Sequence, residues 1–142
     1  MLLRLGAGGF LLFGHGLPKL LAFGEKAARF ADPLHIGSKL SFALATGAEA
    51  LGALLVILGL LTRPAAASVV FTMLVAGLLQ HGGDPWARKE LALLYAVAFA
   101  PLLLTGAGPY SLGRWIARRR GGARKVAPVL DLRESAPTGA AR

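Results

Sequence analysis

The chain has 142 residues, of which 55% are hydrophobic and 16% are charged, and its formal net charge at pH 7 is +9. A soluble globular domain carries about 25% charged residues. A mean hydropathy of +0.59 with so few charges therefore excludes an ordinary soluble domain, and it excludes disorder for the main body. The absence of cysteine excludes disulfides, thiolate metal sites and cysteine nucleophiles. Any redox chemistry therefore depends on a bound cofactor.

Four apolar runs follow one another along the chain, each close to the ~20 residues that a helix needs to cross ~30 Å of hydrocarbon. The runs are Leu2–Phe23, Leu40–Leu61, Pro64–Gln80 and Leu91–Thr105, the last of which we extend backward to Pro85. We predict an all-α fold, an integral membrane four-helix bundle in residues 1–112. A basic juxtamembrane and flexible tail follows in residues 113–142.

Residues that typically start and stop helices flank these runs. Ser38 is placed to cap the second helix and Thr62 the third, while Asp84 followed by Pro85 is suited to the start of the fourth. Gly106 is expected to end the fourth helix.

Two other interpretations of the runs are less favoured. The third and fourth runs are short enough for the core of a soluble bundle, but they are apolar almost all round, without a polar face at a period of 3.6 residues. The first run could be a cleaved signal peptide, with Arg4 as its basic start. Its only candidate cleavage site, Ala22 to Gly24, is weak. We therefore expect all four runs to remain as spans.

Lysine and arginine are concentrated in the segments that four spans would place on one side, together with both termini. This side holds Arg4, Arg63 and the basic run from Arg114 to Lys125, whereas on the other side cations are interspersed with carboxylates. Cationic loops stay in the cytoplasm. Both termini are therefore predicted to be cytoplasmic.

The start of the tail indicates a short helix that lies in the membrane interface. Leu112, Trp115 and Ile116 are spaced at i, i+3 and i+4, with arginines at several of the remaining positions. Such a helix places its cations near anionic lipid headgroups, at ~1 kcal/mol per cation. Because the orientation rule alone explains one basic run beside a span, we expect no nucleic-acid partner. Beyond Gly121 the composition predicts a mobile end.

Five ionisable side chains lie within or beside the spans, where such a residue costs ~2.5 kcal/mol or more at the bilayer centre and indicates a functional site. They are His15, Lys19, Glu49, His81 and Glu90. His15 and Lys19 are four residues apart and share a helix face, and Glu49 is expected ~15 Å below the outer end of its helix. With the predicted orientation, all five lie in the outer half of the bundle. We expect them to line one ligand-binding cavity that opens outward.

The segment from Gly14 to Lys19 is a predicted kink in the first helix. The ring of Pro18 leaves the Gly14 carbonyl without its helical donor, and Gly14 and Gly16 allow another backbone or a ligand to approach closely.

Simpler roles remain open for these side chains. Lys19 can extend its ammonium group to the outer interface, and His15 can donate to a carbonyl of a neighbouring helix. His81 and Glu90 can be ordinary surface groups beside loops. A lone buried carboxylate protonates, so the charge of Glu49 depends on whether Lys19 or His15 reaches it.

A set of short motifs extends over nearly the whole hydrophobic length. The motifs are Arg4 with Gly6, Phe10-Leu11-Leu12, His15-Gly16-x-x-Lys19, Glu49 before Gly52, Leu58-Gly59-Leu60-Leu61-Thr62-Arg63, His81, Glu90-Leu91-Ala92-Leu93-Leu94-Tyr95 and Gly106-x-Gly108-x-Tyr110-Ser111-Leu112. With these motifs the chain resembles the DoxX family of small four-helix bacterial membrane proteins. In that family the last motif usually continues with an aspartate, which Gly113 replaces here.

The resemblance implies a multi-pass protein of the bacterial cytoplasmic (inner) membrane that contacts lipid and redox partner proteins. A related subunit belongs to a thiosulfate:quinone oxidoreductase, and some members associate with superoxide dismutase and a sulfurtransferase in oxidative-stress defence. By this resemblance the five ionisable residues would line a site for a quinone or another small lipophilic molecule. The residues expected to have structural roles are Gly14, Gly16, Pro18, Arg63 and Tyr95. The chain has no thiol, haem-binding pair or dinucleotide loop, so a quinone-binding or non-catalytic subunit is expected.

Two further functions compete with this one. A scaffold would recruit cytosolic partners through the basic tail, and buried ion pairs would then only fix the register of the helices. A proton-coupled transporter would use the carboxylate of Glu49 and the kinked first helix, although four short spans without an internal repeat suit this role poorly in a single protomer. The histidines and carboxylates are permissible metal ligands, but no tight spacing groups them, and we predict no metal site.

Overall fold

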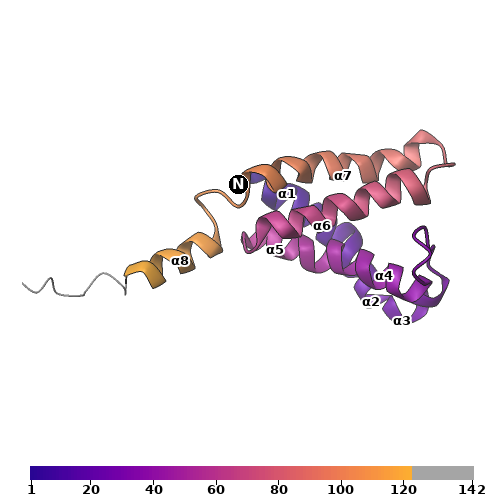
Figure 1. Ribbon diagram of the computed structural model, residues 1–142, viewed down its shortest axis with the longest axis horizontal. Coiled ribbons are helices and arrows are strands. Elements are labelled where there is room, and N and C mark those ends of the chain that lie inside the picture. Colours follow the sequence, from indigo (N-terminus) through magenta and orange to yellow (C-terminus); the bar gives the residue numbers. More distant parts are fainter. Residues whose placement is uncertain (123–142) are drawn as a thin grey trace, which may run out of the picture.

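The computed structural model describes residues 1–122, and all regular structure in this part of the chain is helical. Four long helical rods lie side by side (Figure 1). Rod 1 comprises α1 (Leu2–Leu11), η1 (Leu12–Gly16) and α2 (Leu17–Leu21), and rod 2 comprises α4 (Ser38–Thr46), η3 (Gly47–Gly52) and α5 (Ala53–Leu58). Rod 3 comprises α6 (Thr62–Leu74) and η4 (Val75–Gln80), and rod 4 is α7 (Trp86–Thr105). The short helices α3 (Phe23–Lys26) and η2 (Ala27–Arg29) follow rod 1, and α8 (Leu112–Gly122) follows rod 4.

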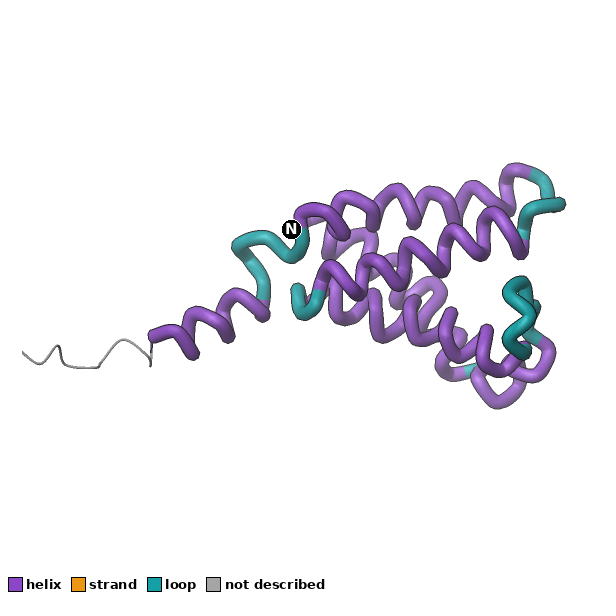
Figure 2. The backbone as a smooth tube through the Cα atoms, in the orientation of Figure 1, coloured by secondary structure: helices purple, strands orange, loops and turns teal. Residues whose placement is uncertain are grey.

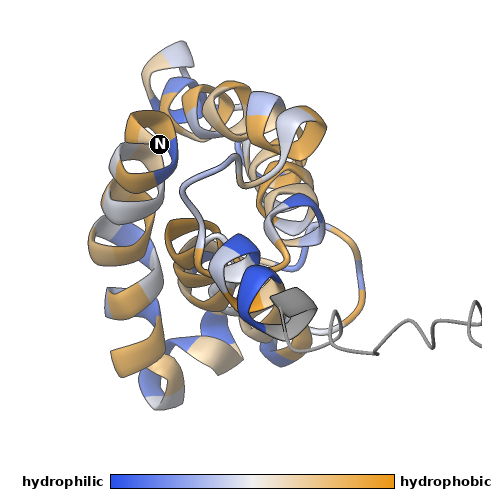
Figure 3. Ribbon diagram, turned by 90° about the vertical axis from the view of Figure 1, so that its left-hand side faces the viewer, coloured by the Kyte–Doolittle hydropathy of each residue, from blue (hydrophilic) through white to orange (hydrophobic). Residues whose placement is uncertain are grey.

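Two of the rods are long and apolar enough to cross a membrane. They are rod 2, Ser38–Leu58 with 21 residues, and rod 3, Thr62–Gln80 with 19 residues. Rod 1 carries Arg4 and Lys19, and rod 4 carries Arg88, Lys89 and Glu90 close to its start. These charges lower the mean hydropathy of both rods. Large apolar side chains are nevertheless exposed on all four rods, among them Phe10, Leu51, Phe71 and Val97. Figure 3 shows hydrophobic residues along the helices of the bundle. Exposed apolar surface this extensive is typical of a protein that contacts lipid.

The core lies in the half of the rods next to the turn between α5 and α6. Each rod contributes a fully buried side chain to it, namely Leu11, Val56, Val69 and Phe99. In this half α1 contacts both α5 and α7, and α6 contacts both α5 and α7, so the rods enclose the core from all sides. Because lipid is as apolar as these side chains, close packing rather than burial from water holds such helices together.

In the opposite half the rods separate into two pairs. There α2 packs against α4 and η3, and η4 packs against α7. Figure 2 shows the two pairs diverging toward this end, with the loop of residues 30–37 between them. A space between rods 2 and 3 results from this divergence.

The helices start differently from the prediction, and only the stop at Gly106 is confirmed, with φ of 73°. Ser38 and Thr62 are the first residues of α4 and α6 and make no capping hydrogen bond, and Pro85 precedes α7. Asp32 instead orders the loop that leads into α4. Its carboxylate accepts hydrogen bonds from the Ile36 and Gly37 amides at 3.0 and 2.7 Å, and from the Ser41 hydroxyl at 2.6 Å. Hydrogen bonds to an ionised carboxylate are stronger than those between neutral groups, so Asp32 holds this loop firmly against the start of α4.

Arg4 has a structural role that the sequence did not predict. Its side chain is 5% exposed, and its guanidinium donates to the carbonyl oxygens of Ala107 and Tyr110, the latter at 2.7 Å. Gly59 leaves room for it, because a Cβ there would lie 2.7 Å from Arg4 Nη1. Arg4 thereby ties α1 to the connection between α7 and α8.

The N-terminus and the start of α8 lie at the same end of the rods, beside the turn between α5 and α6 (Figure 1). The predicted short basic helix is present as α8, which extends away from the rods. On it the Arg119 guanidinium lies 4.0 Å from the ring centroid of Trp115. Of the mobile end predicted beyond Gly121, Gly122 is the last residue of α8. The remainder, with Arg124 and Lys125, lies outside the described residues.

Candidate ligand-binding site

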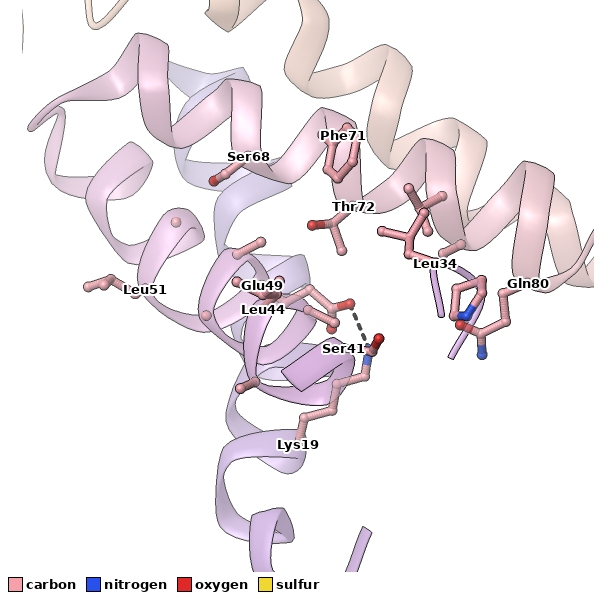
Figure 4. Close-up of a pocket in the computed structure, with 18 of the residues that line it drawn as sticks. Lys19, Leu34, Ser41, Leu44, Glu49, Leu51, Ser68, Phe71, Thr72 and Gln80 are labelled. Carbon is pink, nitrogen blue, oxygen red and sulfur yellow. Dashed lines mark hydrogen bonds and ion pairs between the residues drawn. The ribbon is translucent and has the colours of Figure 1, made fainter. Parts of the chain in front are cut away.

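A cavity of about 720 Å³ occupies the space between rods 2 and 3 (Figure 4). The loop before α4 closes part of it with Phe30, Pro33, Leu34 and Ile36. Most of its wall is aliphatic or aromatic, and the polar side chains that line it are Lys19, Ser41, Glu49, Ser68, Thr72, Gln80 and His81. A large apolar cavity with a few polar groups is the usual form of a small-molecule site.

The two charges in this wall form a direct ion pair. Lys19 Nζ lies 2.6 Å from Glu49 Oε1, and the two residues come from rods 1 and 2 (Figure 4). Glu49 is 3% exposed, whereas the Lys19 side chain is 27% exposed. Lys19 therefore reaches the carboxylate from a partly open position, and it compensates a charge that is otherwise buried.

One oxygen of this carboxylate has no partner. Glu49 Oε2 is buried and makes no hydrogen bond with any described residue. An ionised carboxylate has about four acceptor positions, and a buried acceptor without a donor is costly. Glu49 thus offers a free acceptor beside an apolar cavity, while the Lys19 ammonium retains protons that it can donate.

A π-helical segment accompanies each of three expected site residues. His15 lies in η1, Glu49 lies in η3, and His81 directly follows η4. Such segments are rare and are frequently found at functional sites. Because their hydrogen bonds run from i to i+5, each one turns the side chains that follow it relative to a regular α-helix.

Gly16 brings rod 1 against the backbone of Glu49. A Cβ at Gly16 would lie 2.6 Å from the Glu49 carbonyl carbon and 2.7 Å from Ala50 Cα, and it would collide with the Glu49 carbonyl oxygen. Gly14 has open space around it instead, so close approach concerns Gly16 alone. Pro18 lies at the start of α2, directly after the π-helical turn.

Of the five ionisable residues expected to line one cavity, Lys19, Glu49 and His81 line this one, whereas His15 and Glu90 do not. The His15 ring packs edge-on against Tyr95 of α7, with the ring centroids 5.6 Å apart. The π-helical turn explains this, because it changes the angle between His15 and Lys19. Glu90 is exposed and lies outside the cavity wall.

His81 is part of a small polar cluster at the end of the cavity. His81 Nδ1 lies 2.8 Å from Asp84 Oδ2, and Arg88 Nη1 lies 3.6 Å from the same oxygen. The hydrogen bond with His81 is the main cause that lowers the pKa of Asp84 below its usual 3.8, with a smaller contribution from the charge of Arg88. Asp84 therefore stays ionised and holds the His81 ring beside the cavity.

Arg63, for which a structural role was expected, lies at the opposite end of rod 3. Its Nη2 donates to the Leu104 carbonyl oxygen at 3.1 Å, which joins the start of α6 to the end of α7. Within residues 1–122, no three histidine or acidic side chains come close enough together to hold a metal ion.

Comparison with known proteins identifies the family. The model of the DoxX family matches residues 1–82. No curated protein and no solved structure matches the chain. The matched segment contains rods 1, 2 and 3, and with them the ion pair of Lys19 and Glu49 and the whole cavity wall. Since this segment is more than half of the 142 residues, the chain belongs to the DoxX family.

Proposed function

We propose that this protein spans the bacterial cytoplasmic membrane as a four-helix bundle with both termini in the cytoplasm, and that the cavity between rods 2 and 3 binds a quinone or a similar lipophilic molecule. It would serve as the membrane subunit of a redox or oxidative-stress system. The observation that carries this proposal is the buried carboxylate of Glu49, with its free oxygen, in the wall of an apolar cavity of about 720 Å³.

The donors and acceptors of the ion pair suit a quinone headgroup in both redox states. The Lys19 ammonium can donate to a quinone carbonyl, and Glu49 Oε2 can accept from the hydroxyl of the reduced form. The hydroxyl groups of Ser41 and Thr72 lie in the same wall. When bound, the quinone would supply electron transfer, and the residues of the chain would orient it and hold or release a proton at Glu49.

The apolar part of such a ligand has a matching surface. Leu44, Leu51 and Phe71 line the cavity and are more than half exposed. The wall is therefore continuous with the surface that the bilayer would cover. A lipophilic molecule could enter from the membrane without crossing water.

The test is binding of a decyl-substituted benzoquinone to the full chain in nanodiscs, measured by equilibrium dialysis. Glu49→Gln removes the charge and alters the acceptor, and we expect it to weaken binding of the reduced form about tenfold, the effect of losing one charge-assisted hydrogen bond. Glu90→Gln is the matched control, because it makes the same chemical change outside the cavity. Circular dichroism would verify that both variants fold. Equal affinities for the wild type and the Glu49 variant would refute the quinone site.

A scaffold role is the second candidate, favoured by α8, which extends away from the rods with Arg118 and Arg119 exposed. Here truncation after Gly113 should abolish resistance to oxidative stress in cells, whereas Glu49→Gln should leave it intact. The opposite pattern would favour the quinone site.

A further inference from the structure

A second hollow lies at the other end of the rods, where the termini are. It is a shallow groove of about 510 Å³ between the start of α6 and the connection from α7 to α8. Its polar side chains are Thr62, Arg63, Thr105, Ser111 and Arg114. We propose that this groove binds the phosphodiester headgroup of an anionic phospholipid, independently of any ligand in the larger cavity.

The groove is electropositive, and no carboxylate of residues 1–122 lines it. Arg63 and Arg114 line it, and the buried guanidinium of Arg4 lies behind Gly59 in its wall. The acidic residues in the described part of the chain are Glu25, Asp32, Glu49, Asp84 and Glu90. None of them lines the groove, so the charged side chains that the described part of the chain offers to an anion there are all positive. Phosphate is matched by the planar donor array of arginine.

The start of α6 adds donors that have no partner inside the helix. The helix has 13 residues, and its first amides, those of Thr62 and Arg63, have no carbonyl four residues earlier within it. They lie at the positive end of the helix dipole. Pro64 contributes no donor, and the next amide, that of Ala65, bonds to the Leu61 carbonyl oxygen at 3.0 Å.

An unpaired hydroxyl points independently to a ligand. Thr62 is 4% exposed, it lines the groove, and its Oγ1 has no hydrogen-bond partner among the described residues. Buried hydroxyls are almost always paired. A phosphate oxygen in the groove would accept a hydrogen bond from Thr62 as well as from the helix amides and Arg63.

The surroundings favour a lipid headgroup over free phosphate. Leu61 and Pro64 line both this groove and the cavity between rods 2 and 3, and Leu61 and Leu104 are exposed. A headgroup in the groove can therefore continue into acyl chains that cover this apolar surface. Under the proposed orientation this is the cytoplasmic face, where basic pockets between spans bind anionic headgroups.

The experiment is native mass spectrometry of the full chain released from nanodiscs of phosphatidylglycerol and phosphatidylcholine in equal parts. We expect one retained phosphatidylglycerol per protomer, and a loss of about tenfold in its affinity in Arg63→Gln and in Arg114→Gln, as for a lost charged hydrogen bond. Thr62→Val should weaken retention, and Thr62→Ser should preserve it. The hydrogen bond of Arg114 to Ser111 comes from its backbone amide and not from its side chain. Arg114→Gln should therefore fold, and it tests the site even if Arg63→Gln does not fold.

Arg118→Gln is the matched control, since it removes the same charge from α8 at a position outside the groove. Retention that falls equally in this variant would mean diffuse attraction to the basic helix and would overturn the proposal. Retention of phosphatidylcholine to the same extent as phosphatidylglycerol would also overturn the proposal. Displacement of the lipid by millimolar inorganic phosphate would assign the groove to free phosphate instead.

Discussion

The ion pair of Lys19 and Glu49 combines two charges with unequal surroundings. Glu49 is almost fully buried, whereas the Lys19 side chain is partly exposed. Lys19 Nζ lies 5.9 Å from the ring centroid of Phe30. Removing one partner of a buried ion pair leaves an uncompensated charge and strongly destabilises the fold. Replacing both partners by apolar residues of similar volume is often neutral in stability. Such a pair therefore gives weak stabilisation but strongly constrains which residues can replace either partner. Under the proposed function, we attribute its presence to ligand binding rather than to stability.

Asp32 acts at the same scale, on the loop that closes the cavity. Its pKa lies below the usual 3.8, mainly because the Ser41 hydroxyl donates to its carboxylate, and the Gly37 and Ile36 amides lower it further. The ionised form is thus favoured in the folded protein. Its stabilising effect is fully present above pH 3.8 and is lost as the pH falls through the lowered pKa.

We therefore predict that Asp32→Asn accelerates hydrogen exchange of the Ile36 and Gly37 amides at neutral pH, because a neutral amide oxygen is a weaker acceptor. In the wild type the same amides should lose protection only as the pH falls below 3.8, and in the variant this acid-dependent step should be absent. Hydrogen exchange read by mass spectrometry measures both effects. Glu25→Gln, a change at an exposed carboxylate on α3, should leave the exchange rates unaltered. Identical pH profiles for wild type and Asp32→Asn would disprove the role of Asp32.

At the scale of elements, three rods change from α-helical to π-helical hydrogen bonding along their length. The two π segments η1 and η3 lie against each other. Their contact puts Gly16 on the backbone of Glu49. This contact between the backbones of rods 1 and 2 fixes how far the two rods are shifted along each other. It thereby sets the position at which Lys19, about one turn after Gly16, meets Glu49.

This contact predicts opposite effects for two glycines of η1. Gly16→Ala should destabilise the protein by about 1–3 kcal/mol, the usual cost of overpacking, because the new Cβ meets the Glu49 backbone. Gly14→Ala adds the same methyl group where nothing lies within 4 Å. It should be neutral or stabilising by up to about 1 kcal/mol, since alanine favours helix. Equilibrium unfolding in detergent measures both. Equal destabilisation by the two changes would show that rods 1 and 2 do not pack as described.

For the whole molecule, the rods are closed around a core at one end and divided into two pairs at the other. The core end holds the buried side chains Leu11, Val56, Val69 and Phe99, and it is tied together by Arg4 and Arg63. The divided end holds the cavity. The closely packed core and the cavity therefore lie at different ends of the bundle. With this separation, a ligand in the cavity would not disturb the packing that stabilises the fold.

The distribution of charge between the two ends predicts the topology. Basic segments remain in the cytoplasm. Reporters fused before Met1 and after Arg142 should therefore both report a cytoplasmic position, and a reporter inserted after Gly82 should report a position outside the membrane. Green fluorescent protein and alkaline phosphatase fusions provide the two readouts. External phosphatase activity after Arg142 would contradict the proposed orientation.

The amino-acid sequence by itself determined the helical class, the positions of the four apolar segments, the basic helix after Gly106 and the family. These properties follow from local composition and from motifs that are close together in the chain, so they can be read without knowing which helices touch. The importance of Glu49 was also evident, since a carboxylate within an apolar run is costly and is rarely retained there without a partner or a function.

Only the tertiary structure decided which polar residues meet. It joined Lys19 to Glu49, turned His15 toward Tyr95, left Glu90 outside the cavity and brought Arg4 to the carbonyls of Ala107 and Tyr110. These outcomes depend on the rotation of each rod, which π-helical turns alter, and on contacts between residues up to 106 positions apart. Helical periodicity defines faces along one helix, but the direction in which each face points is fixed by packing between helices.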